Sequence, residues 1–248
     1  MLGFILTRLI SKQVPLALKL DHEAIFDSYW SEADPVAVAS VRDLSKGVAG
    51  WIYLTGSQGG GVSHLLQACS AQALKAGFSA MYVDFLALLE IFEQSVDDEA
   101  VGDYFDSLEN FDVLVLDNID AVSGLRFWQE QLFYLLEKLK NKPNACLLLG
   151  AHTLANDLDC DLLDLKSRLK WATGFQLKPL NDTQKVALLQ FKANRLGLTL
   201  PLDVANFLLA RCSRNFADLS ALLSELDVQA LSSKRRLTIP WIKSILNI

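Results

Sequence analysis

The chain has 248 residues, 51% of them hydrophobic, and a formal net charge of −6. This length is enough for one domain, or two small ones, with a real hydrophobic core. The acidic balance disfavours a protein that binds nucleic acid by itself, because such proteins usually carry a basic face. The basic cluster Lys234–Arg236 is better explained as a solvated helix end than as a DNA site.

Membrane insertion and disulfide chemistry are also disfavoured. No apolar run approaches the roughly 20 residues that a membrane-spanning helix needs. The stretch Met1–Gln13 lacks the organisation of a secretory signal, so we expect a tail. The cysteines, which are Cys69, Cys146, Cys160 and Cys212, form no C-x-x-C pair. We expect reduced core thiols in a cytoplasmic protein.

In chain order, the first part of the sequence alternates apolar strand candidates with helical stretches. Several runs, such as Val113–Leu116, are continuously apolar, which is typical of parallel strands buried on both faces. Strand–helix alternation predicts a doubly wound α/β layer structure. The strands are expected at Gly50–Thr55, Ala80–Phe85, Asp112–Asp117, Ala145–Gly150 and Gly174–Lys178.

After Pro179 the pattern is helical only. Asn181–Thr183 offers N-caps for a helix that ends near Gly197, and Pro201 suits the first position of the next helix. Pro240 is expected to open a short last helix. The helix between them has apolar residues at helical spacing, namely Phe216, Leu219, Leu222, Leu223 and Leu226. We expect a tail over residues 1–20, an α/β domain over 21–175 and a helical domain over 176–248.

A glycine-rich segment, Gly56–His64, directly follows the first expected strand. Gly56, Gly61 and Ser63 match the phosphate-loop pattern G-x-x-x-x-G-K-[ST], in which backbone N–H groups and a helix N-terminus hold phosphates. The position of the lysine holds Val62, and a hydrogen bond to a charged group is worth roughly 1.5–3 kcal/mol. Nucleotide affinity should therefore fall, most of all for a triphosphate. The alternative is a glycine-rich turn that binds nothing.

A second candidate element is the run Val113–Asn118. An acidic residue at the end of a buried strand beside a phosphate loop is where Mg²⁺ or its water is held, so Asp117 and Ser63 are candidate Mg²⁺ ligands. Hydrolysis also needs a group that polarises the attacking water, and Asn118 has no basic oxygen for this. Taken alone, Asp117 is equally explained as a cap or turn residue. The candidate nucleotide-binding residues from these two elements are Gly59, Gly60, Gly61, Val62, Ser63, His64 and Asp117.

A third element, Leu165–Leu169, reads Leu-Lys-Ser-Arg-Leu. An arginine between leucines is ordinarily a helix residue with a solvated head group. Together with the phosphate loop, Asp117 and the helical region, however, this motif resembles the AAA+ family. Further segments resemble a DnaA-related branch of that family, the regulatory inactivators of the bacterial replication initiator DnaA, from about Gln13 to the end of the chain. These segments are Trp51–Leu54, Ser63–Leu66, Leu116–Ile119, Ser167–Leu169, Leu177–Leu180 and Leu237–Pro240.

The resemblance implies roles for two parts of the chain. Arg168 would act as an arginine finger in trans, completing the ATP site of a neighbouring DnaA subunit. A peptide near the N-terminus would dock on the β sliding clamp of DNA polymerase III, and Gln13–Leu18 fits its Q-x-x-L-x-L pattern. Gln13 would hydrogen-bond the clamp, while Leu16 and Leu18 would fill an apolar pocket. Patterns this short also arise by chance.

The sequence departs from the family pattern in three places. Val62 stands where the family keeps a basic residue, and His152 stands at the sensor-1 acidic position. Ala217 stands at the sensor-2 arginine position, with Arg214 one turn earlier as a substitute and a further candidate nucleotide ligand. These departures predict weak nucleotide binding and no self-hydrolysis. They leave the expected role of Arg168 unchanged.

The sequence therefore predicts a non-hydrolysing AAA+ regulator with a five-stranded parallel sheet and a helical lid. It would bind ADP or another nucleoside diphosphate, contact DNA only through the clamp, and stimulate hydrolysis of DnaA-bound ATP, which prevents re-initiation of replication. We expect no DNA-binding domain after the lid and no membrane partner, and a homo-oligomer is left open. The alternative is an autonomous AAA+ ATPase that works as a loader or remodelling subunit, and Val62 and Asn118 argue against it.

Overall fold

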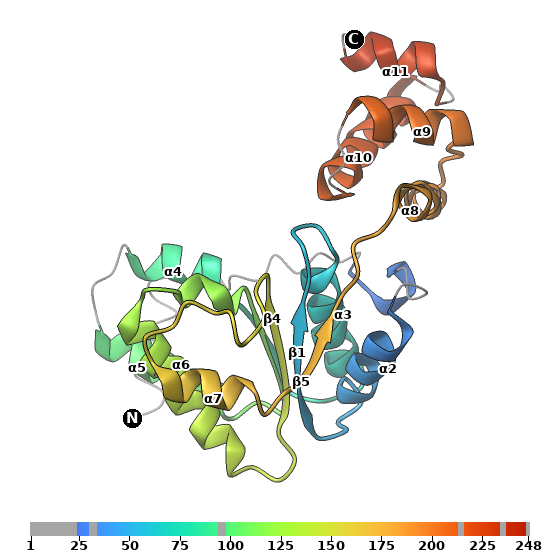
Figure 1. The fold of residues 1–248 in the computed structure, drawn as a ribbon. Helices are drawn as coiled ribbons and strands as arrows, with labels where there is room; N and C mark the ends of the chain where they lie inside the picture. The colour runs from blue at the N-terminus through green and yellow to red at the C-terminus, as the bar shows by residue number, and fades with distance from the viewer. Residues whose placement is uncertain (1–23, 30–33, 94–97, 213–215, 234–236, 247–248) are drawn as a thin grey trace. The chain divides into compact units, whose positions relative to one another are not determined.

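The computed structural model divides the chain into two compact units, an α/β unit that ends at Leu177 and a helical unit that begins at Lys178 and also includes the loop residues Ser57–Gly60 (Figure 1). In the part of the chain that the structure describes, no helix combines the length and the apolar character needed to cross a membrane. The described residues are 24–29, 34–93, 98–212, 216–233 and 237–246.

Five parallel strands form the sheet of the α/β unit, in the order β2-β3-β4-β1-β5. The predicted five-stranded parallel sheet is confirmed, and the strand ends differ from the predicted ones by no more than two residues. β4 lies between β1 and β3, so the strand that leads into the phosphate loop and the strand that ends in Asp117 are not neighbours. The strands are β1 (Gly50–Thr55), β2 (Ala80–Asp84), β3 (Val113–Asp117), β4 (Cys146–Ala151) and β5 (Thr173–Gln176).

Helices cover both faces of this sheet (Figure 1). One face is covered by α2 and α3, and the other by α4, α5, α6 and α7. Two short 3-10 helices, η1 (Phe26–Ser28) and η2 (Ile119–Val122), complete the unit. The α-helices are α2 (Pro35–Leu44), α3 (Val62–Lys75), α4 (Phe85–Glu93), α5 (Asp98–Leu108), α6 (Arg126–Lys140) and α7 (Leu163–Leu169).

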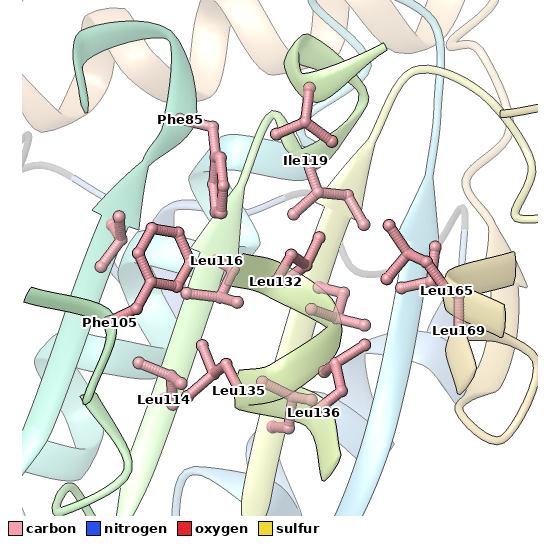
Figure 2. Packing of buried hydrophobic residues seen from close by; sticks show 14 of the residues in the cluster. Phe85, Phe105, Leu114, Leu116, Ile119, Leu132, Leu135, Leu136, Leu165 and Leu169 are labelled. Atoms are coloured by element: carbon pink, nitrogen blue, oxygen red, sulfur yellow. The ribbon is translucent and has the colours of Figure 1, made fainter. Parts of the chain in front are cut away.

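Alternation along each strand sends side chains into a separate core on each face of the sheet. In β3, Leu114 and Leu116 belong to the core under α5 and α6, whereas Val113 and Val115 belong to the core under α2 and α3. Figure 2 shows the first of these cores, in which Leu114 and Leu116 lie among side chains from the covering helices. Burying one such side chain contributes about 1.5–3 kcal/mol, so the two cores account for the continuously apolar strands.

The short helix α7 is attached to the sheet by two leucines four positions apart. Leu165 and Leu169 are both 0% exposed and point into the core in Figure 2. Residues at this spacing share one helix face. Arg168 lies on the neighbouring face of α7, so its side chain runs along the surface of the unit.

The helical unit contains α8 (Asp182–Arg195), α9 (Leu202–Arg211), α10 (Phe216–Ser233) and α11 (Ile239–Leu246), so the predicted helical lid is confirmed. Asn181 caps α8, because its side chain accepts a hydrogen bond from the Gln184 backbone at 2.9 Å while the Gln184 side chain accepts one from the Asn181 backbone. Pro201 is the N-cap of α9 and not its first residue, and Pro240 is the second residue of α11. The apolar faces of these helices form their own core.

The cysteines correct one prediction. Cys69, Cys146 and Cys160 are free and buried, as expected of core thiols, but Cys212 is exposed. Cys212 is the C-cap residue of α9, directly after its last turn.

Candidate nucleotide site and arginine finger

The glycine-rich segment forms a tight loop between β1 and α3. Gly59 and Gly61 have φ angles of 74° and 90°, in the left-handed region that favours glycine. The Gly60 N–H donates to the Ser57 carbonyl at 2.7 Å, and a Cβ on Gly60 would lie 2.7 Å from that same oxygen. These glycines are therefore required by the loop, which leads into the N-terminus of α3 as a phosphate loop does.

Val62, at the position of the phosphate-loop lysine, is turned into the core. It is 8% exposed and belongs to the core under α2 and α3. Its two methyl groups pack on the backbones of Gly56 and Gly150, since a Cβ on either glycine would lie 3.0 Å from a Val62 methyl. The side chain therefore offers neither charge nor contact to a bound phosphate.

Asp117, the last residue of β3, is 1% exposed and is held by hydrogen bonds from neutral donors. The Tyr82 hydroxyl donates to its Oδ2 at 2.7 Å, and the Asn118 backbone N–H donates to its Oδ1 at 2.9 Å. Ser63 also lowers the pKa of the Asp117 carboxyl, so the structure brings Ser63 and Asp117 together. Burial raises the pKa of Asp117, and these hydrogen bonds partly oppose that rise.

Sequence reasoning missed two residues of this site. Tyr82, in β2, is buried and also accepts a hydrogen bond from the Gln67 amide at 3.3 Å, and burial raises the pKa of its phenol. The sequence feature that could have marked Tyr82 is a tyrosine in a buried strand, because its hydroxyl needs a polar partner. Gly150, in β4, lies beneath Val62 and Asp117, because a Cβ there would be 2.8 Å from Asp117 Oδ1. The sequence feature that could have marked Gly150 is a glycine inside an apolar strand, which often indicates a close approach of another group.

The donor set fits a resident Mg²⁺ poorly. Asp117 is 1% exposed and each of its carboxylate oxygens already accepts a hydrogen bond, so little of the carboxylate is open to a metal ion or its water. Across the described residues, no group of three or more His, Cys, Asp or Glu side chains could hold a metal ion. We therefore derive no step through Mg²⁺ at Ser63 and Asp117.

The residues expected at two further catalytic positions make other contacts. Asn118 has a φ of 53°, precedes η2, and donates through its side-chain amide to Asp84 Oδ1 at 2.8 Å. His152, after β4, contacts Asp120 Oδ2 through its backbone N–H at 3.2 Å and through its ring Nδ1 at 3.4 Å. Neither side chain therefore supplies a carboxylate base to water near the loop.

His64, on the first turn of α3, binds the segment that includes η1. Its Nε2 lies 3.1 Å from both the Ser28 hydroxyl and the Ile25 carbonyl oxygen. Its ring also packs against Tyr29, at 5.8 Å between centroids. The imidazole thus ties the N-terminal segment of the unit to the start of α3.

Arg168 lies on α7 between β4 and β5, as predicted from the sequence. Its Nε donates to the Glu137 carboxylate of α6. The guanidinium lies over the Trp171 ring at 4.4 Å and over the Phe133 ring at 5.6 Å. With 23% of the side chain exposed, Arg168 is partly buried but reaches the surface.

The remaining predicted site residues fall outside the described part of the chain. They are Gln13, Leu16, Leu18 and Arg214. Ala217, at the sensor-2 position, lies in the first turn of α10.

The strand order, the phosphate loop and the C-terminal helical unit define an AAA+ fold. The family profile of the bacterial DnaA ATPase domain matches residues 20–176, and the chain belongs to that family. The helical unit matches the lid domain of Hda over residues 182–246, which agrees with the resemblance drawn from the sequence.

Solved structures agree on the fold. Domain III of the replication initiator DnaA from Thermotoga maritima superposes with a TM-score of 0.78 at 17% identity, covering 91% of this chain and 96% of that one. The AMPPCP-bound DnaA from Aquifex aeolicus gives a TM-score of 0.71 at 19% identity, covering 86% of this chain and 68% of that one. At these identities the likeness concerns the fold, and the roles of individual residues rest on the geometry above.

Proposed function

We propose that this chain is a regulatory inactivator of the replication initiator DnaA, and that it stimulates hydrolysis of DnaA-bound ATP by supplying Arg168 in trans. The observation that carries the proposal is the position of Arg168 on α7, partly exposed and with its guanidinium carbon 4.4 Å from the centre of the Trp171 ring. A planar, permanently charged guanidinium suits the negative charge that spreads over a phosphoryl group in transfer. The DnaA-type fold and the Hda-type lid support DnaA as the partner.

The chain's own nucleotide site supports a regulator more than an ATPase. Val62 is buried and brings no charge to phosphates, and the Asn118 amide is engaged with Asp84. The loop glycines and the N-terminus of α3 still offer backbone donors to a diphosphate. We propose that ADP or another nucleoside diphosphate binds there as a stable ligand, contacted by the backbone of residues 59–64 and by Asp117 and Arg214. The alternative of an autonomous loader or remodelling ATPase lacks both the cation and the base that it would need.

A second part of the proposal concerns location. Gln13, Leu16 and Leu18 would dock on the β sliding clamp loaded on DNA, which brings Arg168 to DnaA after replication has started. A short peptide that orders on binding gives weak affinity by itself, because ordering entropy offsets part of the contact energy. Two such peptides on one clamp would gain from effective concentration, which favours a chain that acts as an oligomer.

The test of the function is hydrolysis of DnaA-bound ATP in the presence of the clamp, DNA and this chain. Arg168→Ala should abolish stimulation, because an arginine supplied in trans contributes roughly 10³–10⁵ in rate. Arg168→Lys should lose nearly as much, because an ammonium is a point charge and cannot bridge two phosphate oxygens. Initial rates of phosphate release measure both effects.

A neighbouring cation provides the matched control. Lys170→Ala removes an exposed charge just after α7 and should leave stimulation near the wild-type value. Thermal melts should show that all three variants are folded. Normal stimulation by a folded Arg168→Ala chain would overturn the proposed function.

A further inference from the structure

The surroundings of Arg168 assign roles to two residues that no motif marks. We propose that Glu137 and Trp171 are positioning residues, which hold the Arg168 guanidinium in one orientation with its two terminal nitrogens free for a phosphoryl group. The inference rests on the proposed function of Arg168 and adds the reason why this arginine, among the basic residues of the surface, suits that function.

The contact with Glu137 uses the inner nitrogen of the guanidinium. Glu137 Oε1 accepts from Nε of Arg168, and Nε is the donor nearest the backbone. The terminal nitrogens form the fork that binds two oxygens of a phosphate at once. A carboxylate that accepts from Nε therefore fixes the end of the aliphatic chain and leaves the fork available.

The contact with Trp171 fixes the plane of the same group. The guanidinium carbon lies 4.4 Å from the centre of the Trp171 ring, and Phe133 adds a second aromatic neighbour at 5.6 Å. Trp171 is itself held, because its ring packs near Trp51 at 6.2 Å and lies under the Lys140 ammonium at 4.4 Å. With Nε bound to a carboxylate and the guanidinium carbon over an indole ring, the group is restrained before any partner arrives.

The fixed orientation of the guanidinium matters for catalysis more than for the stability of the fold. The two charged side chains are 23% and 34% exposed, and ion pairs near a surface contribute little to folding. A catalytic group that is already oriented, by contrast, avoids an entropic cost at the transition state, and a misplacement of about 1 Å costs up to 10²-fold in rate. Loss of Glu137 should therefore lower the maximal stimulated rate while barely changing the melting temperature.

The experiment compares Glu137→Ala with Glu137→Gln in the assay of DnaA-bound ATP hydrolysis, titrating the chain to saturation. Glu137→Ala should lower the maximal rate at least about tenfold, with little change in the chain concentration that gives half-maximal stimulation. Glu137→Gln keeps an acceptor oxygen for Nε and should recover most of that rate. Trp171→Leu keeps an apolar side chain but removes the ring face, and should lower the maximal rate about two- to fivefold.

Controls separate the outcomes. Glu130→Ala, on the same helix, removes a carboxylate that pairs with Arg126 and should leave stimulation unchanged. If Arg168→Ala abolishes stimulation but Glu137→Ala behaves as wild type, the positioning inference fails and the proposed function stands. If a folded Arg168→Ala chain stimulates normally, the proposed function fails first. If Glu137→Ala stimulates more than wild type, Glu137 restrains the arginine, and the inference is overturned.

Discussion

At the scale of single residues, the site around Asp117 holds a carboxylate without the cation that a phosphate-loop lysine would bring. Val62 packs against Gly56 and Gly150, and the hydrogen bonds to Asp117 come from a phenol and a backbone N–H. Neutral donors stabilise a buried carboxylate less than an ammonium does. Burial therefore raises the pKa of Asp117, and the neutral donors offset only part of that rise.

This rise makes the stability of the α/β unit depend on pH. An unfolded Asp ionises near its ordinary pKa, whereas folded Asp117 ionises only at higher pH. Between those values the folded state binds more protons, so the free energy of unfolding falls as pH rises. Asp117→Asn removes this titration. The difference in free energy of unfolding between variant and wild type should therefore shift in favour of the variant as pH rises, measured by urea denaturation at several pH values.

A constant or opposite difference across the pH series would contradict that expectation. Asp103→Asn, which removes an exposed carboxylate on α5, reports the effect of losing one acidic charge as such.

At the scale of elements, the sequence predicted what depends on local pattern and missed what depends on strand order. Strands such as β3 could be predicted because continuous apolar runs need burial on both faces. The place of β4 between β1 and β3 could not, because no local pattern encodes the order of parallel strands. For the same reason Gly150 and Tyr82 were missed at the nucleotide site, and Glu137 was missed beside Arg168, 31 positions along the chain.

The helix α7 carries Arg168, the residue of the proposed function, and is attached to its unit by other residues. Leu165→Ala removes a fully buried side chain and should lower the free energy of unfolding by about 2–5 kcal/mol. Stimulation should fall with it, because α7 would no longer hold Arg168 against Trp171. Urea denaturation and the stimulation assay measure the two effects.

Leu163→Ala is the matched control on the same helix. Leu163 is 73% exposed, so its truncation should change the free energy of unfolding by no more than about 0.5 kcal/mol. Equal losses for the two leucines would show that α7 is not anchored as described.

At the scale of the whole molecule, the net charge and the chemistry of the candidate nucleotide site both agree with the proposed regulator. A chain with a net charge of −6 gains little from the phosphate backbone of DNA, which agrees with a proposal in which a clamp peptide brings it to DNA. A phosphate loop that binds through backbone amides and has no lysine should also prefer the nucleotide that carries fewer negative charges.

The pure chain should therefore bind a nucleoside diphosphate more tightly than the triphosphate and show negligible turnover of ATP. Because Asp117 is 1% exposed and both of its oxygens already accept hydrogen bonds, chelation of Mg²⁺ should leave the affinity for the diphosphate nearly unchanged. Isothermal titration calorimetry with and without a chelator measures the affinities, and phosphate release measures turnover. Tighter binding of the triphosphate, or steady hydrolysis, would contradict these expectations.

The packing of Val62 also constrains how this chain can change over evolutionary time. A lysine at position 62 would vacate the space that two methyl groups fill on the backbones of Gly56 and Gly150. Asn118 would still lack a base and would still be engaged with Asp84. Under the proposed function, a single substitution at either position would therefore not give an ATPase, and the change at position 62 would also disturb the packing of the core.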